Sequence, residues 1–364
     1  MAINRAIHSN LAIPPGEYLE EVLDELGMTK DELARRMGRP ATKLSPIFKG
    51  EKAITPETAL QLEQVVGVPA HIWLGLETEY RLTLARQENE LCEEDLGEER
   101  ELVKKFQYSE LVKAGMIEKY TKPIDRVREL RKAFGVMSLR NVTESPRYQA
   151  AFRYGRSAVG ERTPEAVAAW LRMGELLAQR SNCASFNEDK LRGALKDLRT
   201  MTLQEPDDFR DQLQIKLAEC GVALVVCPHF PKTKAHGATF WMGRDKAVLM
   251  LTLRFKWADI FWFSLFHEIG HILLHGRQAV ILEDYGDNEK EEQADRFASN
   301  TLIPSDAYEH FIQMGEFREN DIEVFARRVG VDRGIVVGRL QHDGKLEKSW
   351  LNNLRSRYVW SETD

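Results

Sequence analysis

Short amphipathic helices, each followed by a glycine, are the pattern of the first 80 or so residues. Apolar side chains recur every three or four positions, which is the period of a helix with one buried face. The pattern predicts four helices, at residues 18–26, 29–37, 39–49 and 55–66. Two of them have start signals, because Thr29 and Glu32 have the spacing of a capping box and Thr55 precedes Pro56.

The pattern changes in the second half of the chain. Residues 102–218 look mostly helical and show no recognisable chemistry. A continuous β-branched run at residues 222–227 predicts a buried strand, and residues 238–242 and 247–253 predict a hairpin. Helical spacing returns from residue 258. A few strands followed by helices predict an α+β, mostly α-helical fold rather than a doubly wound sheet.

The composition is that of a globular protein, with 43% hydrophobic and 30% charged residues. The formal net charge of -6 gives no general attraction to nucleic acid, so DNA binding requires a local basic cluster. The cysteines lack a paired spacing, no apolar run approaches a membrane span, and no secretion signal precedes the first helix. We therefore expect a cytoplasmic protein with reduced thiols and no membrane partner. Collagen-like, disulfide-rich secreted, membrane and fully disordered classes are excluded.

The strongest chemical signal is the HExxH sequence His267-Glu268-Ile269-Gly270-His271. At helical spacing His267 and His271 lie one turn apart on one face, where they can share a metal ion. Almost every other side chain of residues 260–275 is apolar, so this face is a polar stripe on a buried helix. A divalent ion would satisfy the stripe, whereas ordinary hydrogen bonds between the histidines and their neighbours are the alternative.

A catalytic zinc site has three protein ligands and a water, so a third ligand is expected on a neighbouring helix. Residues 290–302 form that helix in our interpretation, and Glu291 lies close to its buried face while Glu292 points toward solvent. Asp295, one turn after Glu291, is placed to accept the second ring N–H of a ligating histidine. The alternative for Asp295 is a surface charge paired with a neighbouring basic residue.

The segments HEIGH at 267–271, EEQADRFA at 291–298 and TLIP at 301–304 resemble the ImmA/IrrE metallopeptidases. The similarity covers roughly residues 215–345, and Gln293 departs from it by replacing a common second glutamate. The resemblance implies a zincin-like domain with Zn²⁺ and peptidase activity.

In that chemistry Glu268 is the general base that takes the proton of the metal-activated water and passes it to the leaving amine. His236 and Tyr285 are candidates for contacting the oxyanion or the substrate, with purely structural or surface roles as the alternative. The strand at 238–242 could lie at a sheet edge and pair with an extended peptide.

The N-terminal helices at 29–37 and 40–49 have the short connection of a helix-turn-helix. Residues 30–52 contain seven basic and three acidic side chains, so this part of the chain is locally positive. The candidate DNA contacts are Arg39, Thr42, Lys43 and Lys49. Pro46 falls inside the expected recognition helix and predicts a shortened or kinked helix, with Ser45 as its cap and Pro46 as its first residue. A protein–protein adaptor is the alternative for the same module.

Residues 9–86 also resemble HigA-type antitoxins, through segments such as PPGE at 14–17 and ITPETAL at 54–60. The stretch 87–101 has eight acidic residues and one basic residue, which predicts a solvated linker rather than an acidic binding site. The expected domains are a helix-turn-helix domain, an acidic linker, a helical middle region, a metallopeptidase domain and a tail, at 1–86, 87–101, 102–214, 215–345 and 346–364.

The first hypothesis is a zinc-dependent endopeptidase fused to a DNA-binding regulator or antitoxin. Its expected partners are operator DNA, a protein substrate such as a repressor, antitoxin or toxin, and a second copy of the chain in a homodimer. The second hypothesis is a HigA-type antitoxin or repressor whose zinc domain is a non-catalytic sensor or scaffold. The third is an antitoxin that masks a toxin and has little affinity for DNA.

Overall fold

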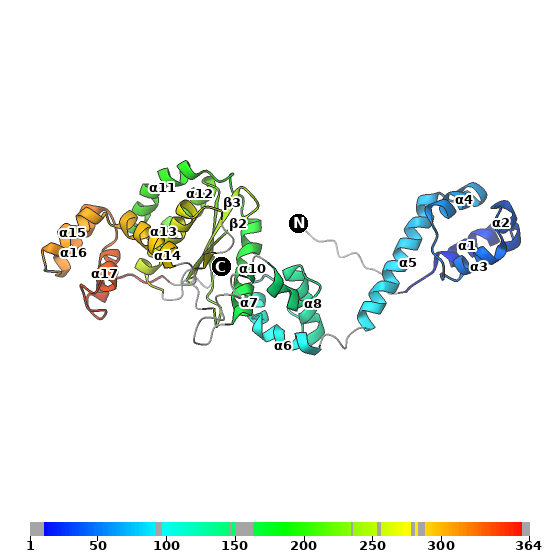
Figure 1. The fold of residues 1–364 in the computed structure, drawn as a ribbon, viewed down its shortest axis with the longest axis horizontal. Helices are drawn as coiled ribbons and strands as arrows, with labels where there is room; N and C mark the ends of the chain where they lie inside the picture. Colours follow the sequence, from blue (N-terminus) through cyan, green and yellow to red (C-terminus); the bar gives the residue numbers. More distant parts are fainter. Residues whose placement is uncertain are drawn as a thin grey trace. The chain divides into compact units, whose positions relative to one another are not determined.

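The computed structural model describes residues 11–91, 97–145, 148–149, 163–233, 236–252, 256–277, 281–282 and 288–358. The chain divides into two compact units, Met1–Gly97 and Glu98–Asp364 (Figure 1). The division falls inside the acidic stretch 87–101. In the described part of the chain, no helix is both long and apolar enough to cross a membrane.

The first unit is helical, as the apolar spacing predicted. Its helices are α1 (Pro15–Glu25), α2 (Lys30–Arg36), α3 (Ala41–Phe48), α4 (Pro56–Val66) and α5 (Ala70–Leu91). The side chain of Thr29 caps α2 by accepting from the backbone N–H of Glu32 at 3.2 Å, and Thr55 caps α4 in the same way. Leu19, Leu33 and Trp73 are among the buried side chains of the core.

The recognition-helix candidate α3 differs from the expectation about Pro46. The helix begins at Ala41 and continues through Pro46 to Phe48, so Pro46 is not its first residue. A proline inside a helix costs about 3 kcal/mol, whereas each buried large apolar side chain contributes roughly 1.5–3 kcal/mol. Leu44, Ile47 and Phe48 are all buried, which explains why the helix persists.

The second unit begins with a run of helices, and the first of them includes the last residues of the acidic stretch. They are α6 (Gly97–Lys105), α7 (Tyr108–Lys113), α8 (Pro123–Phe134), η2 (Leu139–Glu144), α10 (Pro164–Arg180), α11 (Glu188–Thr200), η3 (Met201–Leu203) and α12 (Pro206–Glu219). Glu99, expected in a solvated linker, is instead buried and accepts from Arg131 at 2.8 and 2.9 Å and from the backbone of Leu139 at 3.1 Å. Burial acts to raise the pKa of Glu99, but Arg131 and the other hydrogen bonds outweigh it and lower the pKa.

A small mixed sheet follows. Its strands are β1 (Val222–Cys227), β2 (Gly237–Met242), β3 (Lys246–Thr252) and β4 (Ile281–Leu282), and the described strands are ordered β1-β3-β2-β4. β2 and β3 form the predicted antiparallel hairpin, with Gly237 opposite Leu251, and β1 runs parallel to β3. β2 was expected at an edge, but β4 pairs with it at Ala238 and Thr239.

The C-terminal helices pack against this sheet and complete the unit. They are α13 (Ala258–Leu274), α14 (Asn288–Leu302), α15 (Ser305–Gln313), α16 (Glu319–Val329), α17 (Arg333–His342) and η4 (Asn352–Leu354). α13 is buried along most of its length and contacts the sheet, α14 and α17. The predicted α+β, mostly helical fold class is confirmed. Because α13 is buried between the sheet and other helices, its polar side chains form a buried site.

Candidate metal centre

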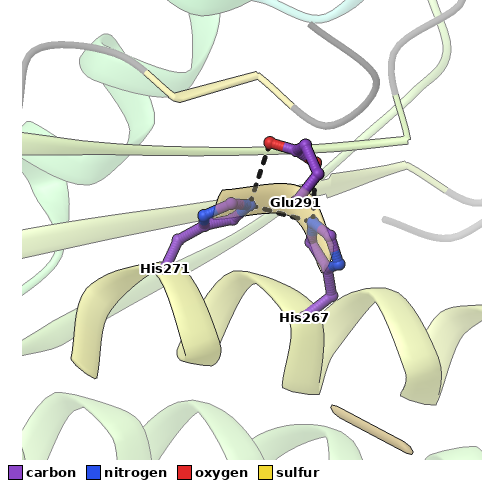
Figure 2. Close-up of side chains that lie close together, drawn as sticks. All are labelled: His267, His271 and Glu291. Carbon is purple, nitrogen blue, oxygen red and sulfur yellow. Dashed lines mark hydrogen bonds and ion pairs between the residues drawn. The ribbon is translucent and has the colours of Figure 1, made fainter. Parts of the chain in front are cut away.

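Two histidines on α13 and one glutamate on α14 bring their ligand atoms together (Figure 2). His267 and His271 lie one turn apart, so their rings leave α13 on the same side, and their Nε2 atoms are 2.9 Å apart. Glu291 reaches over from α14, with Oε2 3.3 Å from Nε2 of His267 and Oε1 3.5 Å from Nε2 of His271. His267 is 2% exposed and His271 0%, so the cluster is shielded from bulk water.

The first ring is oriented by Asp295. Nδ1 of His267 lies 2.8 Å from Oδ1 of Asp295, which is an acceptor, so this nitrogen carries the proton and donates it. Asp295 lies one turn after Glu291 on α14, where the sequence spacing put it. Its side chain is 50% exposed, so the outer side of this contact meets solvent.

The second ring is oriented by a chain of residues that the sequence reasoning did not identify. Nδ1 of His271 lies 2.9 Å from Nδ1 of His275, and Nε2 of His275 lies 3.2 Å from Oε1 of Gln293. Gln293 in turn donates to Glu289 at 3.3 Å. The amide oxygen of Gln293 only accepts, so His275 donates from Nε2 and accepts at Nδ1, which leaves His271 as donor at Nδ1. The signals in the sequence were the polar position of His275 and the departure from the family pattern at Gln293.

These contacts leave three electron-pair donors facing one point. Both Nδ1 atoms of His267 and His271 are donors, so each neutral ring presents a lone pair at Nε2. Oε1 of Glu291 is buried and accepts no hydrogen bond from any described residue. Two imidazole nitrogens and a carboxylate are the ligands of many catalytic zinc sites. The residues therefore fit a divalent ion held by three protein ligands.

The ionisation of the cluster agrees with that fit. Burial acts to raise the pKa of the Glu291 carboxyl, but the His267 and His271 rings, which can donate to this carboxylate and carry positive charge when protonated at Nε2, outweigh burial and lower the pKa to about 2. Burial lowers the pKa of His271, which favours the neutral ring that a metal requires.

Glu268 lies beside this cluster on α13 and is completely buried. The hydroxyl of Thr239 on β2 donates to Oε2 of Glu268. A Cβ at Gly237 would collide with Oε1 of the same carboxylate, so the absence of a side chain there makes room for it. Neither Thr239 nor Gly237 was identified from the sequence, because only the packing of β2 on α13 brings them to Glu268.

The structure describes only one of the two residues predicted to contact the oxyanion or the substrate. His236 precedes β2, where its backbone carbonyl accepts from Thr252 at 2.8 Å, and its side chain lines a cavity beside α13 rather than joining the metal cluster. Tyr285 lies outside the described residues.

The candidate DNA contacts lie on and around α3 in the first unit. Thr42, Lys43 and Lys49 are exposed. Arg39 is engaged within the unit, where it donates to the hydroxyl of Thr58 at 3.0 Å. Of the four candidate DNA contacts, Thr42, Lys43 and Lys49 are therefore the exposed ones.

Two family models match separate parts of the chain. A helix-turn-helix model matches residues 19–73, and the IrrE N-terminal-like domain of peptidase family M78 matches residues 230–341. An uncharacterized HTH-type transcriptional regulator YddM of Escherichia coli K12 is 36% identical over 73 residues, covering 20% of this chain and 78% of that protein. Virulence-associated protein I of Dichelobacter nodosus is 35% identical over 80 residues, covering 22% of this chain and 74% of that protein.

Solved structures match a part of the chain of similar extent. An addiction module antidote protein of the HigA family from Coxiella burnetii is 30% identical, covering 23% of this chain and 92% of that chain with a TM-score of 0.21. The Pseudomonas aeruginosa antitoxin HigA with the higBA promoter is 30% identical, covering 22% of this chain and 87% of that chain with a TM-score of 0.21.

Proposed function

Because this chain belongs to the helix-turn-helix regulators by its first unit and carries an IrrE N-terminal-like peptidase domain in its second, we propose that it is a DNA-binding regulator with zinc-dependent endopeptidase activity. Its substrate in this proposal is a regulatory protein, such as a repressor, antitoxin or toxin. The observation that carries the proposal is the convergence of ligand atoms from two imidazoles and one carboxylate within 4.8 Å of one another.

His267, His271 and Glu291 would hold the ion through Nε2, Nε2 and a carboxylate oxygen. When bound, zinc lowers the pKa of a coordinated water to about 7 and polarises the scissile carbonyl. Asp295 and His275 keep the lone pairs of the two rings directed inward, because each contact fixes which ring nitrogen carries the proton.

Glu268 is the general base in this proposal. The Thr239 hydroxyl donates to Oε2, which holds the carboxylate in one orientation. Oε1 is then the atom that accepts a proton from the attacking water and later passes it to the leaving amine nitrogen. Complete burial of Glu268 keeps bulk water from competing for that proton.

The DNA-binding half of the proposal is carried by α3. Lys43 and Lys49 are exposed, so both are available for contacts with phosphate groups. Thr42 precedes them at the start of the helix, where side chains reach base edges in helix-turn-helix proteins.

The test is cleavage of proteins encoded beside this one, and of a proteome-derived peptide library, by the zinc-loaded chain with and without a chelator. Fragments are identified by mass spectrometry, and the Glu268→Gln variant is the matched control. Zinc-dependent fragments that are absent with Glu268→Gln support the proposal. One zinc per chain without any fragment from either source contradicts it and favours a sensor or scaffold role for the zinc domain.

A further inference from the structure

A cavity of about 270 Å³ lies beside the metal centre, between α13, α14 and α17. Its apolar lining comes from Ile260 and Phe263 of α13, Leu302 and Ile303 at the end of α14, and Ile335 of α17. None of the metal ligands lines it, so it is a separate space and not the metal site itself.

Residues of the cavity lining neighbour residues of the metal cluster on both α13 and α14. On α14, Asp295 and Ser299 are one turn apart, and Ser299 lines the cavity while Asp295 holds His267. On α13, Phe263 lies one turn before His267, and the centres of the two rings are 6.2 Å apart. A helical turn rises about 5.4 Å, and an extended peptide rises about 3.3 Å per residue, so the offset of one turn between cavity and cluster is comparable to one or two residues of an extended peptide.

The walls of the cavity are set by direct contacts between elements. A Cβ at Gly338 would collide with Asp259, so the lack of a side chain at this position allows α17 to approach α13 closely. Arg355 donates to both carboxylate oxygens of Asp259, at 2.8 and 3.0 Å. The cavity is therefore preformed, and the charge of Asp259 is neutralised by a fixed partner.

Two basic side chains of α17 along the lining share one acidic partner. Arg339 donates to Asp343 at 2.7 Å, and Nδ1 of His342 lies 3.1 Å from the other oxygen of Asp343. An acidic side chain entering the cavity would have to compete with Asp343 for both groups. The pairing favours an uncharged occupant.

The size of the cavity narrows the choice further. Apolar cavities of about 150 Å³ bind benzene, whereas sites for whole drug-sized molecules span about 300–1,000 Å³. A space of about 270 Å³ therefore suits one large side chain. We propose that this cavity is the specificity pocket of the peptidase and takes a Leu, Met or Phe side chain next to the scissile bond. The inference rests on the proposed peptidase function.

Substitution of Ser299 by phenylalanine tests the pocket. Ser299 lines the cavity, whereas the next residue, Asn300, is exposed, so Asn300→Phe is the matched control. In the peptide library, cut sites of the zinc-loaded wild-type chain and of Asn300→Phe should carry Leu, Met or Phe on one side. One methylene in an apolar pocket changes the ratio of kcat/KM between two substrates by about 10–200-fold. The wild-type chain should therefore cleave after or before Leu at least about tenfold faster than at Ala, and this preference should disappear in Ser299→Phe. Zinc content should be equal in all three proteins.

A binding measurement separates failure of the pocket from failure of the peptidase proposal. Acetyl-Ala-Leu-Ala-amide should bind the full chain at least about tenfold more tightly than acetyl-Ala-Gly-Ala-amide by calorimetry, and Ser299→Phe should remove the difference. Cleavage without a preference for apolar side chains, or equal binding of the two peptides, would contradict the assignment of this cavity as the specificity pocket. Selective binding that Ser299→Phe abolishes, without any cleavage, would uphold the pocket and reject the peptidase function.

Discussion

At the scale of single residues, the ligand cluster predicts that metal binding stabilises the fold. Three electron-pair donors are buried at one point, and no described residue donates a hydrogen bond to Oε1 of Glu291. Leaving buried polar groups without partners costs about 1–3 kcal/mol each. We therefore expect an ion bound at this point to stabilise the second unit.

The first prediction separates the ligands from the general base. His271→Ala and Glu291→Ala should bind less zinc and lower the free energy of unfolding, because a ligand present at 1,000 times its Kd stabilises by about 4 kcal/mol. Glu268→Gln should retain the zinc and lose turnover. Zinc content, thermal unfolding and peptide cleavage measure the three effects. Loss of zinc from Glu268→Gln as extensive as from His271→Ala would contradict its assignment as the base.

The second prediction concerns Gln293, which holds His275 and through it His271. Loss of an outer contact of this kind typically lowers metal affinity by about 10–100-fold. Gln293→Ala should therefore weaken zinc binding by that factor, measured by competition with a chelator of known affinity. Glu292→Ala is the control, since its side chain is exposed on the same helix. Equal zinc affinity of the two variants would mean that Gln293 does not position His271.

At the scale of elements, α3 is where the DNA-binding proposal can be tested by charge alone. Lys43→Glu combined with Lys49→Glu should weaken binding to all DNA sequences and lower the slope of log affinity against log salt by about 2, because each phosphate contact releases counterions. The same double change at Lys104 and Lys122, exposed lysines of the second unit, is the control. Mobility shifts at several salt concentrations give the slope. An unchanged slope would reject α3 as the DNA-facing element.

The elements also show what the sequence could predict. Helical spacing put Glu291 near the buried face of α14 and Asp295 one turn after it, because a helix face depends only on the period of that helix. The hydrogen bond between His275 and Gln293 depends on how α13 and α14 are aligned, and no periodicity contains that information. The α+β class was predictable from strands followed by helices.

Other elements lacked a readable signal. β4 has two residues, which is too short for an alternating pattern, so β2 was expected at an edge. Leu60 is apolar and yet 57% exposed, and its residue type alone does not reveal this. Glu99 sits in a run of acidic residues, and only the fold supplies Arg131 as its partner. In each case the missing information was contact between elements that are distant in the sequence.

At the scale of the whole molecule, the two units have separate cores. The buried cluster of the first unit runs from Leu19 to Trp73, and the main cluster of the second from Leu191 to Tyr358. A unit with its own core can in principle fold alone. The stretch 87–101 carries one basic and eight acidic residues, a net charge of -7, which disfavours association with DNA or with another acidic surface.

The last prediction is that DNA binding and metal binding are separable. A fragment of residues 1–97 should fold and bind DNA without zinc, because its core contains no residue of the metal cluster. A fragment of residues 98–364 should retain one zinc per chain and should not bind DNA. Circular dichroism, zinc analysis and mobility shifts on the fragments and the full chain make the comparison. Removing zinc from the full chain should change its DNA affinity by less than tenfold, and a larger change would mean that the units are coupled by more than about 1.4 kcal/mol.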